Sequence, residues 1–154
     1  MNIQRKSKGF TIIEVVLVLA IAGLIFLMVF IALPALQRSQ RDTQRKTDLA
    51  RAVVSLTSYT ANNRGALPAS DAWDDFLVSY LKAGGDTFID PSGTEYVFKY
   101  GLDISNAVFD AETPNIAVTA GATCDGEELV TGQGARKVAL QMKLEGGGIT
   151  CASN

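Results

Sequence analysis

Hydrophobic positions in this chain are concentrated in one uninterrupted block near the amino terminus. Twenty of the 22 residues from Val15 to Leu36 are apolar, and none is charged. At the helical rise of about 1.5 Å per residue, the block covers about 33 Å, which is enough to cross the hydrocarbon core of a bilayer. No second apolar segment of that length could cover such a helix in a soluble core. The pattern therefore predicts a helix that is buried in a membrane or in a filament.

The helical period continues beyond the block, but it becomes amphipathic. Leu49, Val53 and Leu56 recur at helical spacing, and polar residues such as Ser58 lie on the opposite face. The following run 62–65, Asn-Asn-Arg-Gly, tolerates positive φ and is a typical helix end. We expect one helix from about residue 10 to residue 62, with its second half packed on other elements.

Shorter elements are predicted after the long helix. A helix capped by Ser70 or Asp71 would place its apolar residues on one face and end at Gly84-Gly85. Alternating polar and apolar residues predict strands at 94–101 and 138–144, and shorter candidates lie at 116–119 and 104–109. The run 90–93, Asp-Pro-Ser-Gly, is typical of a type I turn. We expect an α+β fold in which the long helix packs on a small antiparallel sheet.

Charge is segregated along the chain, although the formal net charge is only -2. The first nine residues carry three bases and no acid, residues 37–51 carry five bases and two acids, and residues 52–154 carry six bases and thirteen acids. A count of flanking bases weakly favours a cytoplasmic large domain. The two cysteines, Cys124 and Cys151, favour the opposite, because a disulfide is their simplest interpretation and disulfides persist outside the cytosol.

The composition offers little for catalysis or for metal binding. The chain has no histidine, which removes the usual general base and the imidazole ligand. Asp71, Asp74 and Asp75 form an acidic cluster, but acids in a first helical turn complement the helix dipole, and no calcium-loop spacing follows. The glycines lack the order of a phosphate-binding loop. We expect neither an enzyme, nor a metal site, nor a cofactor.

Three arginines after the apolar block form a basic stripe. Arg38, Arg41 and Arg45 stand at i, i+3 and i+7 and therefore share one helix face. One hypothesis is that the stripe binds DNA, with salt-dependent affinity. The favoured alternative is that these arginines neutralise Asp42, Asp48 or a neighbouring subunit.

Three residues in the apolar region are unusual for a simple membrane anchor. Glu14 introduces a carboxylate, Gly23 lies in the middle of the helix, and Pro34 removes a helical hydrogen bond near the end and favours a kink. Glu14 either reaches the membrane interface or pairs with a specific cationic partner. The residues alone leave both possibilities open.

The nine residues from Lys8 to Val16, KGFTIIEVV, combine a basic leader, a glycine before an aromatic residue and a glutamate four positions later. Followed by the long apolar helix, this string resembles the amino terminus of type IV pilins and pseudopilins. The resemblance implies that a prepilin peptidase cleaves between Gly9 and Phe10 and methylates Phe10. It also implies that Glu14 acts in assembly, that the leader is cytoplasmic and that the large domain lies outside. The helix proline of the family usually comes a few residues before Pro34, so the bend is expected to be displaced.

The resemblance also implies a domain organisation and a function. Residues 1–9 would be the leader, 10–36 the membrane and filament-core half of the helix, and 37–154 the extracytoplasmic domain with a late disulfide. The expected protein is a homo-oligomeric pilus subunit, held in the cytoplasmic membrane before assembly by the pilus machinery and exposed at the cell surface afterwards. Its expected roles are adhesion, motility or DNA uptake. The alternatives are a pseudopilin of a type II secretion system and a minor pilin that binds DNA.

Overall fold

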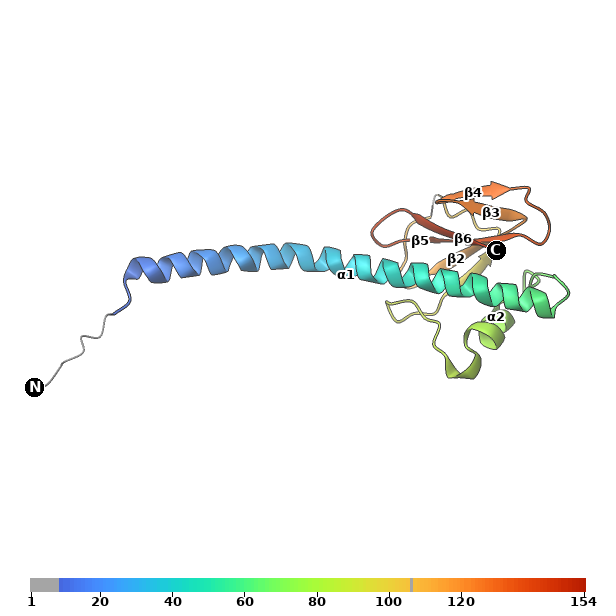
Figure 1. The fold of residues 1–154 in the computed structure, drawn as a ribbon, viewed down its shortest axis with the longest axis horizontal. Coiled ribbons are helices and arrows are strands. Elements are labelled where there is room, and N and C mark those ends of the chain that lie inside the picture. Colours follow the sequence, from blue (N-terminus) through green and yellow to red (C-terminus); the bar gives the residue numbers. More distant parts are fainter. Residues whose placement is uncertain (1–8, 106) are drawn as a thin grey trace, which may run out of the picture. The chain divides into compact units, whose positions relative to one another are not determined.

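The computed structural model describes residues 9–105 and 107–154, which divide into two compact units, one up to Gln37 and one from Arg38 to Asn154. Helix α1 (Ile12–Asn62) forms the first unit and continues into the second (Figure 1). The elements that follow are α2 (Trp73–Phe76), the π-helical turn η1 (Leu77–Leu81), the 3-10 turn η2 (Ala83–Gly85) and the strands β1 (Val97–Tyr100), β2 (Asn115–Ala120), β3 (Ala122–Asp125), β4 (Glu128–Thr131), β5 (Val138–Lys143) and β6 (Ile149–Ser153).

Helix α1 begins and ends close to the expected residues. Its end is made by Arg64 and Gly65, which adopt positive φ angles of 57° and 83°. The N–H of Gly65 donates to the carbonyl of Thr60 at 2.7 Å, which satisfies one of the last helical carbonyls. The expected helix from about residue 10 to residue 62 is therefore confirmed, with a start two residues later.

The main sheet has the strand order β1-β2-β5-β6, and its pairs are not all antiparallel. β2 pairs antiparallel with β5, and β5 with β6, but β1 runs parallel to β2. The expectation of a purely antiparallel sheet is wrong for this pair, because the connection 101–114 crosses back before β2 begins. Alternation shows which face of a strand is buried and not the direction of its neighbour. The described residues of segment 104–109 form no strand, so the prediction of a strand there is wrong.

The core lies between the second half of α1 and one face of this sheet. Leu49, Ala52 and Leu56 of α1 are fully buried, as the amphipathic pattern predicts. Opposite them, Val118 of β2 and Leu140 of β5 are cross-strand partners with no exposed surface. An aromatic cluster, in which neighbouring rings pack edge to face, tilted or stacked, extends this core. Its members are Tyr59, Trp73, Phe76, Tyr80, Phe88, Tyr96 and Phe98. The α+β fold is confirmed.

The short helix differs from its expected form at the amino-terminal end. Ala72 occupies the capping position and no side chain caps the helix, so the prediction that Ser70 or Asp71 would do so is wrong. After Phe76 the helix widens into η1, and Gly84 and Gly85 end the segment with positive φ angles. The expected apolar face is still present, because packing against the aromatic core fixes these residues without a cap.

The hairpin β3–β4 covers the other face of the sheet, and the sequence pattern did not predict it. In Figure 1 the hairpin lies on the side of β5 and β6 that faces away from α1. Ala139 is fully buried and Gln141 is 8% exposed, although alternation places both on the solvent side of β5. The Gln141 side chain donates to the carbonyl of Glu127 at 3.2 Å. The second unit therefore has three layers.

A buried arginine connects four segments of the second unit. The Arg45 guanidinium has no exposed surface and donates to both carboxylate oxygens of Asp90, at 2.6 and 2.8 Å. It also donates to Asp42 at 2.9 Å and to Glu145 at 3.2 Å. The ring of Phe109 covers it, with its centroid 4.4 Å from the guanidinium carbon. Arg45 thus holds α1, the 90–93 turn, the β5–β6 turn and the crossover loop together.

The β5–β6 turn is attached to α1 a second time by its backbone. The N–H groups of Glu145 and Gly146 donate to the two carboxylate oxygens of Asp42, at 2.9 and 2.7 Å. A Cβ at Gly146 would lie 2.9 Å from the Asp42 carboxylate, so only glycine allows this approach. The group Asp42, Arg45, Asp90 and Glu145 is called the Arg45 cluster below.

Hydrogen bonds from arginines shift the pKa values of Glu145 and Asp90. Hydrogen bonds from Arg41, and then from Arg45, lower the pKa of Glu145 to about 2. Burial acts to raise the pKa of Asp90, but hydrogen bonds from Arg45 and Ser92 outweigh it, and the pKa lies below its ordinary value. A carboxyl whose pKa is lower in the folded state stabilises the fold above its unfolded pKa and loses that contribution as the pH falls.

We expect Glu145→Gln to reduce the free energy of unfolding at pH 7 by about 1 to 2 kcal/mol, because it removes a charged acceptor from Arg41 and Arg45. The difference from the unsubstituted chain should shrink between about pH 5 and pH 2, because only the unsubstituted chain loses the Glu145 contribution there. Urea unfolding of the full chain in detergent, followed by the fluorescence of its single tryptophan, Trp73, measures this. The exposed Glu128→Gln is the matched control. A difference that stays constant with pH would contradict the electrostatic account.

Candidate functional site

The first candidate site is the amino-terminal end of α1. Gly9 and Phe10 precede the helix without regular secondary structure, and Phe10 is 89% exposed. Among the residues that the structure describes, no atom lies within 4 Å of a Cβ built at Gly9, so these residues leave the Gly9-Phe10 peptide bond open to an enzyme. The bases of the leader, Arg5, Lys6 and Lys8, lie outside the described residues.

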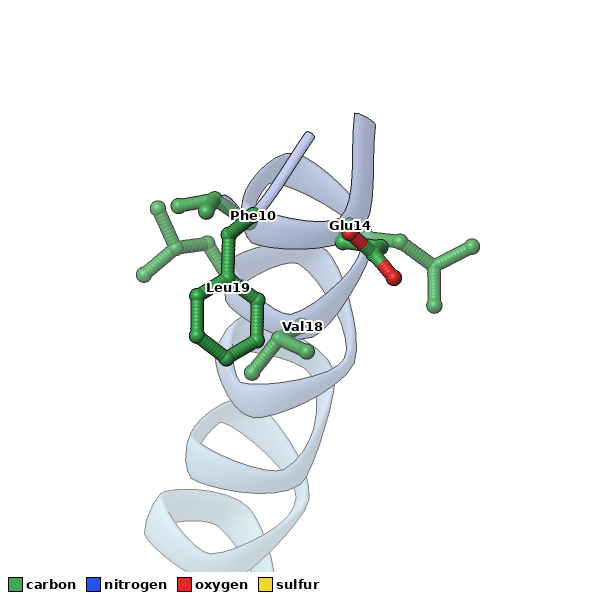
Figure 2. A pocket seen from close by; sticks show the side chains of 6 residues that line it. Phe10, Glu14, Val18 and Leu19 are labelled. Carbon is green, nitrogen blue, oxygen red and sulfur yellow. The ribbon is translucent and has the colours of Figure 1, made fainter. Parts of the chain in front are cut away.

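Glu14 forms a reciprocal cap with Thr11 at the start of α1. Its carboxylate accepts the backbone N–H of Thr11 at 2.9 Å and the Thr11 hydroxyl at 2.8 Å. In return, the N–H of Glu14 donates to the Thr11 hydroxyl oxygen at 3.4 Å. Thr11 and Glu14 therefore form a capping box, which satisfies donors that the helix start leaves free. Figure 2 shows Phe10, Glu14, Val18 and Leu19 around a shallow concavity at this end.

The helix that follows is left exposed by residues 9–105 and 107–154. Every large hydrophobic side chain from Ile12 to Leu36 is exposed, and Phe30, for example, is 74% exposed. Helix α1 contains an 18-residue window with a mean hydropathy of 3.2, so it is long and apolar enough to cross a membrane. Exposing this much apolar surface to water is strongly unfavourable. Lipid or other protein must cover it.

Gly23 and Pro34 both lie inside this part of α1. No atom lies within 4 Å of a Cβ built at Gly23, so its lack of a side chain leaves a free position on the helix surface. Pro34 is inside the helix and has no N–H for the carbonyl of Phe30, four residues earlier. Both residues lie on exposed helix surface that a partner could contact. Their roles in assembly stay predictions.

The basic stripe is not an open surface. Arg45 is buried in the Arg45 cluster, and Arg41 forms hydrogen bonds with Glu145 at 2.8 and 2.5 Å. These hydrogen bonds raise the pKa of Arg41. Arg38 is 59% exposed, and its nearest carboxylate oxygen, on Glu145, is 3.8 Å away. Asp42 is neutralised as expected, whereas Asp48 pairs with Arg51 and not with the stripe.

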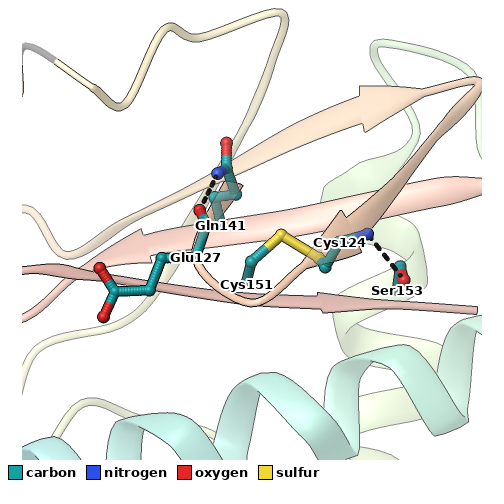
Figure 3. Close-up of a disulfide and its surroundings, with 5 residues drawn as sticks. All are labelled: Cys124, Glu127, Gln141, Cys151 and Ser153. Carbon is teal, nitrogen blue, oxygen red and sulfur yellow. Dashed lines mark hydrogen bonds between the residues drawn. A yellow bond between two sulfur atoms is a disulfide. The ribbon is translucent and has the colours of Figure 1, made fainter. Parts of the chain in front are cut away.

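The expected disulfide is present in the second unit. Cys124 of β3 and Cys151 of β6 are bonded, with their Cα atoms 5.8 Å apart (Figure 3). The backbone N–H of Cys124 also donates to the Ser153 hydroxyl at 3.1 Å. The bond joins the β3–β4 hairpin to the edge strand of the main sheet, and it closes a long loop in the unfolded chain, which favours the folded state.

The acidic cluster shows no arrangement for metal binding. Asp74 and Asp75 lie in the first turn of α2, as expected, and Asp71 is exposed just before it. Within residues 9–105 and 107–154, no group of three or more acidic or cysteine side chains is placed to hold a metal ion.

Sequence reasoning missed several contacts of the candidate residues. The spacing of Thr11 and Glu14 is that of a capping box and could have revealed their contact. The pairing of Arg45 with Asp90 and Glu145 had no local signal, because 45 and 100 residues separate the partners. Such contacts come only from the tertiary fold.

The comparisons agree with the geometry of the amino terminus. A family model described as the prokaryotic N-terminal methylation motif matches residues 4–30. No curated protein and no solved structure matches the chain. The matched residues contain the expected cleavage site, the capping box and most of the exposed apolar helix. The chain carries the prokaryotic N-terminal methylation motif, which is the hallmark of type IV pilins and pseudopilins.

Proposed function

We propose that this protein is a structural subunit of a type IV pilus. The observation that carries the proposal is the apolar half of α1, whose large hydrophobic side chains are all exposed among the described residues and which overlaps a methylation motif. Lipid covers this surface while the subunit is held in the membrane, and the helices of neighbouring subunits cover it after assembly. The second unit then forms the surface of a filament used for adhesion, motility or DNA uptake.

Processing prepares the amino terminus for the change from lipid cover to cover by neighbouring subunits. A prepilin peptidase cleaves between Gly9 and Phe10, leaves 145 of the 154 residues, and methylates the new amino group. Loss of Arg5, Lys6 and Lys8 changes the formal side-chain charge from -2 to -5. The cap survives this step, because its backbone donor is the N–H of Thr11 and not that of Phe10.

Glu14 directs the register between subunits in this proposal. A carboxylate in hydrocarbon or in a dry filament core is unfavourable unless donors or a cation meet it. Thr11 supplies donors within the chain before assembly. In the filament, the amino group of Phe10 on a neighbouring subunit supplies a cation. Sliding one subunit along the other would separate these charges, so the ion pair fixes the axial position.

The closest alternative is a pseudopilin of a type II secretion system, which would share the same amino terminus and form a short periplasmic fibre. A minor DNA-binding pilin is less favoured, because Arg45 is buried and Arg41 is paired. A structural role is also proposed over a catalytic one, since the chain has no histidine to act as a general base.

We expect surface fibres sheared from cells to contain this chain in its processed form. Intact-mass and amino-terminal peptide analysis should show a start at Phe10, 145 residues and one methyl group on the terminal amine. Electron microscopy of the same preparation should show filaments that label along their length with an antibody against the second unit. Chains that keep the leader, or that occur only in the periplasm, would contradict the pilus assignment.

We expect Glu14→Gln and Glu14→Ala both to abolish efficient fibre assembly while membrane insertion and leader cleavage continue. The two variants separate charge from capping, because glutamine retains an oxygen that can accept the Thr11 N–H and alanine does not. Counting fibres per cell and measuring cleaved subunit in membranes tests both parts.

Thr11→Ala is the matched control for this experiment. It removes the hydroxyl of the cap and keeps the Glu14 charge, so it should retain fibres. If Glu14→Gln cells display normal numbers of fibres made only of the variant, the intersubunit ion pair is wrong. Capping or interface snorkelling would then be the better account of Glu14.

A further inference from the structure

Arg38 is the first charged residue after the apolar block and the least neutralised arginine of the basic stripe. It follows Leu36 by two residues in the same helix, which is a rise of about 3 Å. Its side chain is 59% exposed, compared with 35% for Arg41 and none for Arg45. When the block spans a bilayer, Arg38 therefore lies at the level of the lipid headgroups.

The Arg45 cluster explains why Arg38 is left available. Among the described residues, the acid within 4 Å of its guanidinium is Glu145, and both oxygens of that carboxylate already accept closer donors from Arg41, at 2.5 and 2.8 Å. Arg45 adds a third donor at 3.2 Å. The Arg38 Nε lies 3.8 Å from Glu145, which is beyond hydrogen-bond distance. The guanidinium thus keeps its donors for another acceptor.

We propose that Arg38 binds the phosphate of an anionic phospholipid at the Leu36 end of the span, in the membrane-inserted subunit before assembly. A guanidinium matches phosphate oxygens in a bidentate geometry, and its charge favours a lipid with net negative charge over a zwitterionic one. The inference rests on the membrane-inserted state and not on fibre formation. Glu145 controls the site, because it neutralises Arg41 and leaves Arg38 as the most exposed arginine of the basic stripe.

The test uses the full mature chain in phosphatidylcholine vesicles that contain spin-labelled phosphatidylglycerol or spin-labelled phosphatidylcholine. Electron paramagnetic resonance measures the relative association of the two lipids with the protein. The unsubstituted chain should prefer phosphatidylglycerol by up to about fivefold. Arg38→Gln should remove most of this preference, and high salt should reduce it.

Two matched variants make the result specific to the geometry. Lys46→Gln removes an exposed base eight residues, or about 12 Å, further along the helix and should have a smaller effect. Glu145→Gln should increase the preference for phosphatidylglycerol, because it releases Arg41. General damage to the fold would not increase this preference. Inorganic phosphate should weaken the preference no more than chloride at the same ionic strength. A stronger effect would indicate a free-phosphate site and overturn the proposal.

An unchanged preference in Arg38→Gln would also overturn it. If that variant keeps its lipid preference but loses fibres, Arg38 instead pairs with an acid of a neighbouring subunit. If it keeps the preference but shifts DNA less than the unsubstituted chain, Arg38 contributes to DNA binding. A chain that never forms fibres yet shows the predicted lipid preference would disprove the pilus role and leave this inference standing.

Discussion

The structure depends on one constraint, which is that half of α1 has no cover from the part of the chain that the structure describes. Every large hydrophobic residue from Ile12 to Leu36 is exposed, and a soluble chain would not tolerate that surface. The cover must come first from lipid and then from other subunits. The capping box of Thr11 and Glu14, the approachable Gly9-Phe10 bond and the methylation motif all lie at the start of this segment.

The second unit neutralises charge, because its part of α1 carries many charged residues next to the apolar span. Arg45 is buried, and its charge is balanced by Asp42, Asp90 and Glu145, which come from three segments. Removing one partner of such a group leaves an uncompensated buried charge, which is strongly destabilising. The same group ties the β5–β6 turn to α1 and, through Glu145, neutralises Arg41. Folding therefore reduces the positive charge that flanks the span.

Local patterns predicted the long helix, its end, strands β1, β2 and β5 and the amino-terminal motif, because each depends on residues a few positions apart. Strand β6 was not predicted. The Cys124–Cys151 bond was also accessible, since the chain holds only two cysteines. The parallel pairing of β1 with β2 and the β3–β4 hairpin were not, because alternation carries no information about strand order. The partners of Arg45 were hidden for a similar reason, since Glu145 is 100 residues away.

The most direct test of this account compares two positions whose side chains are similarly exposed within the chain. Phe30 is 74% exposed and Val54 is 67% exposed, and both native cysteines are in the disulfide. Phe30→Cys and Val54→Cys should therefore differ in intact membranes only through what covers them from outside. A membrane-impermeant maleimide should label Val54→Cys and leave Phe30→Cys unlabelled until detergent and denaturant are added. Equal labelling of the two variants in intact membranes would contradict the account.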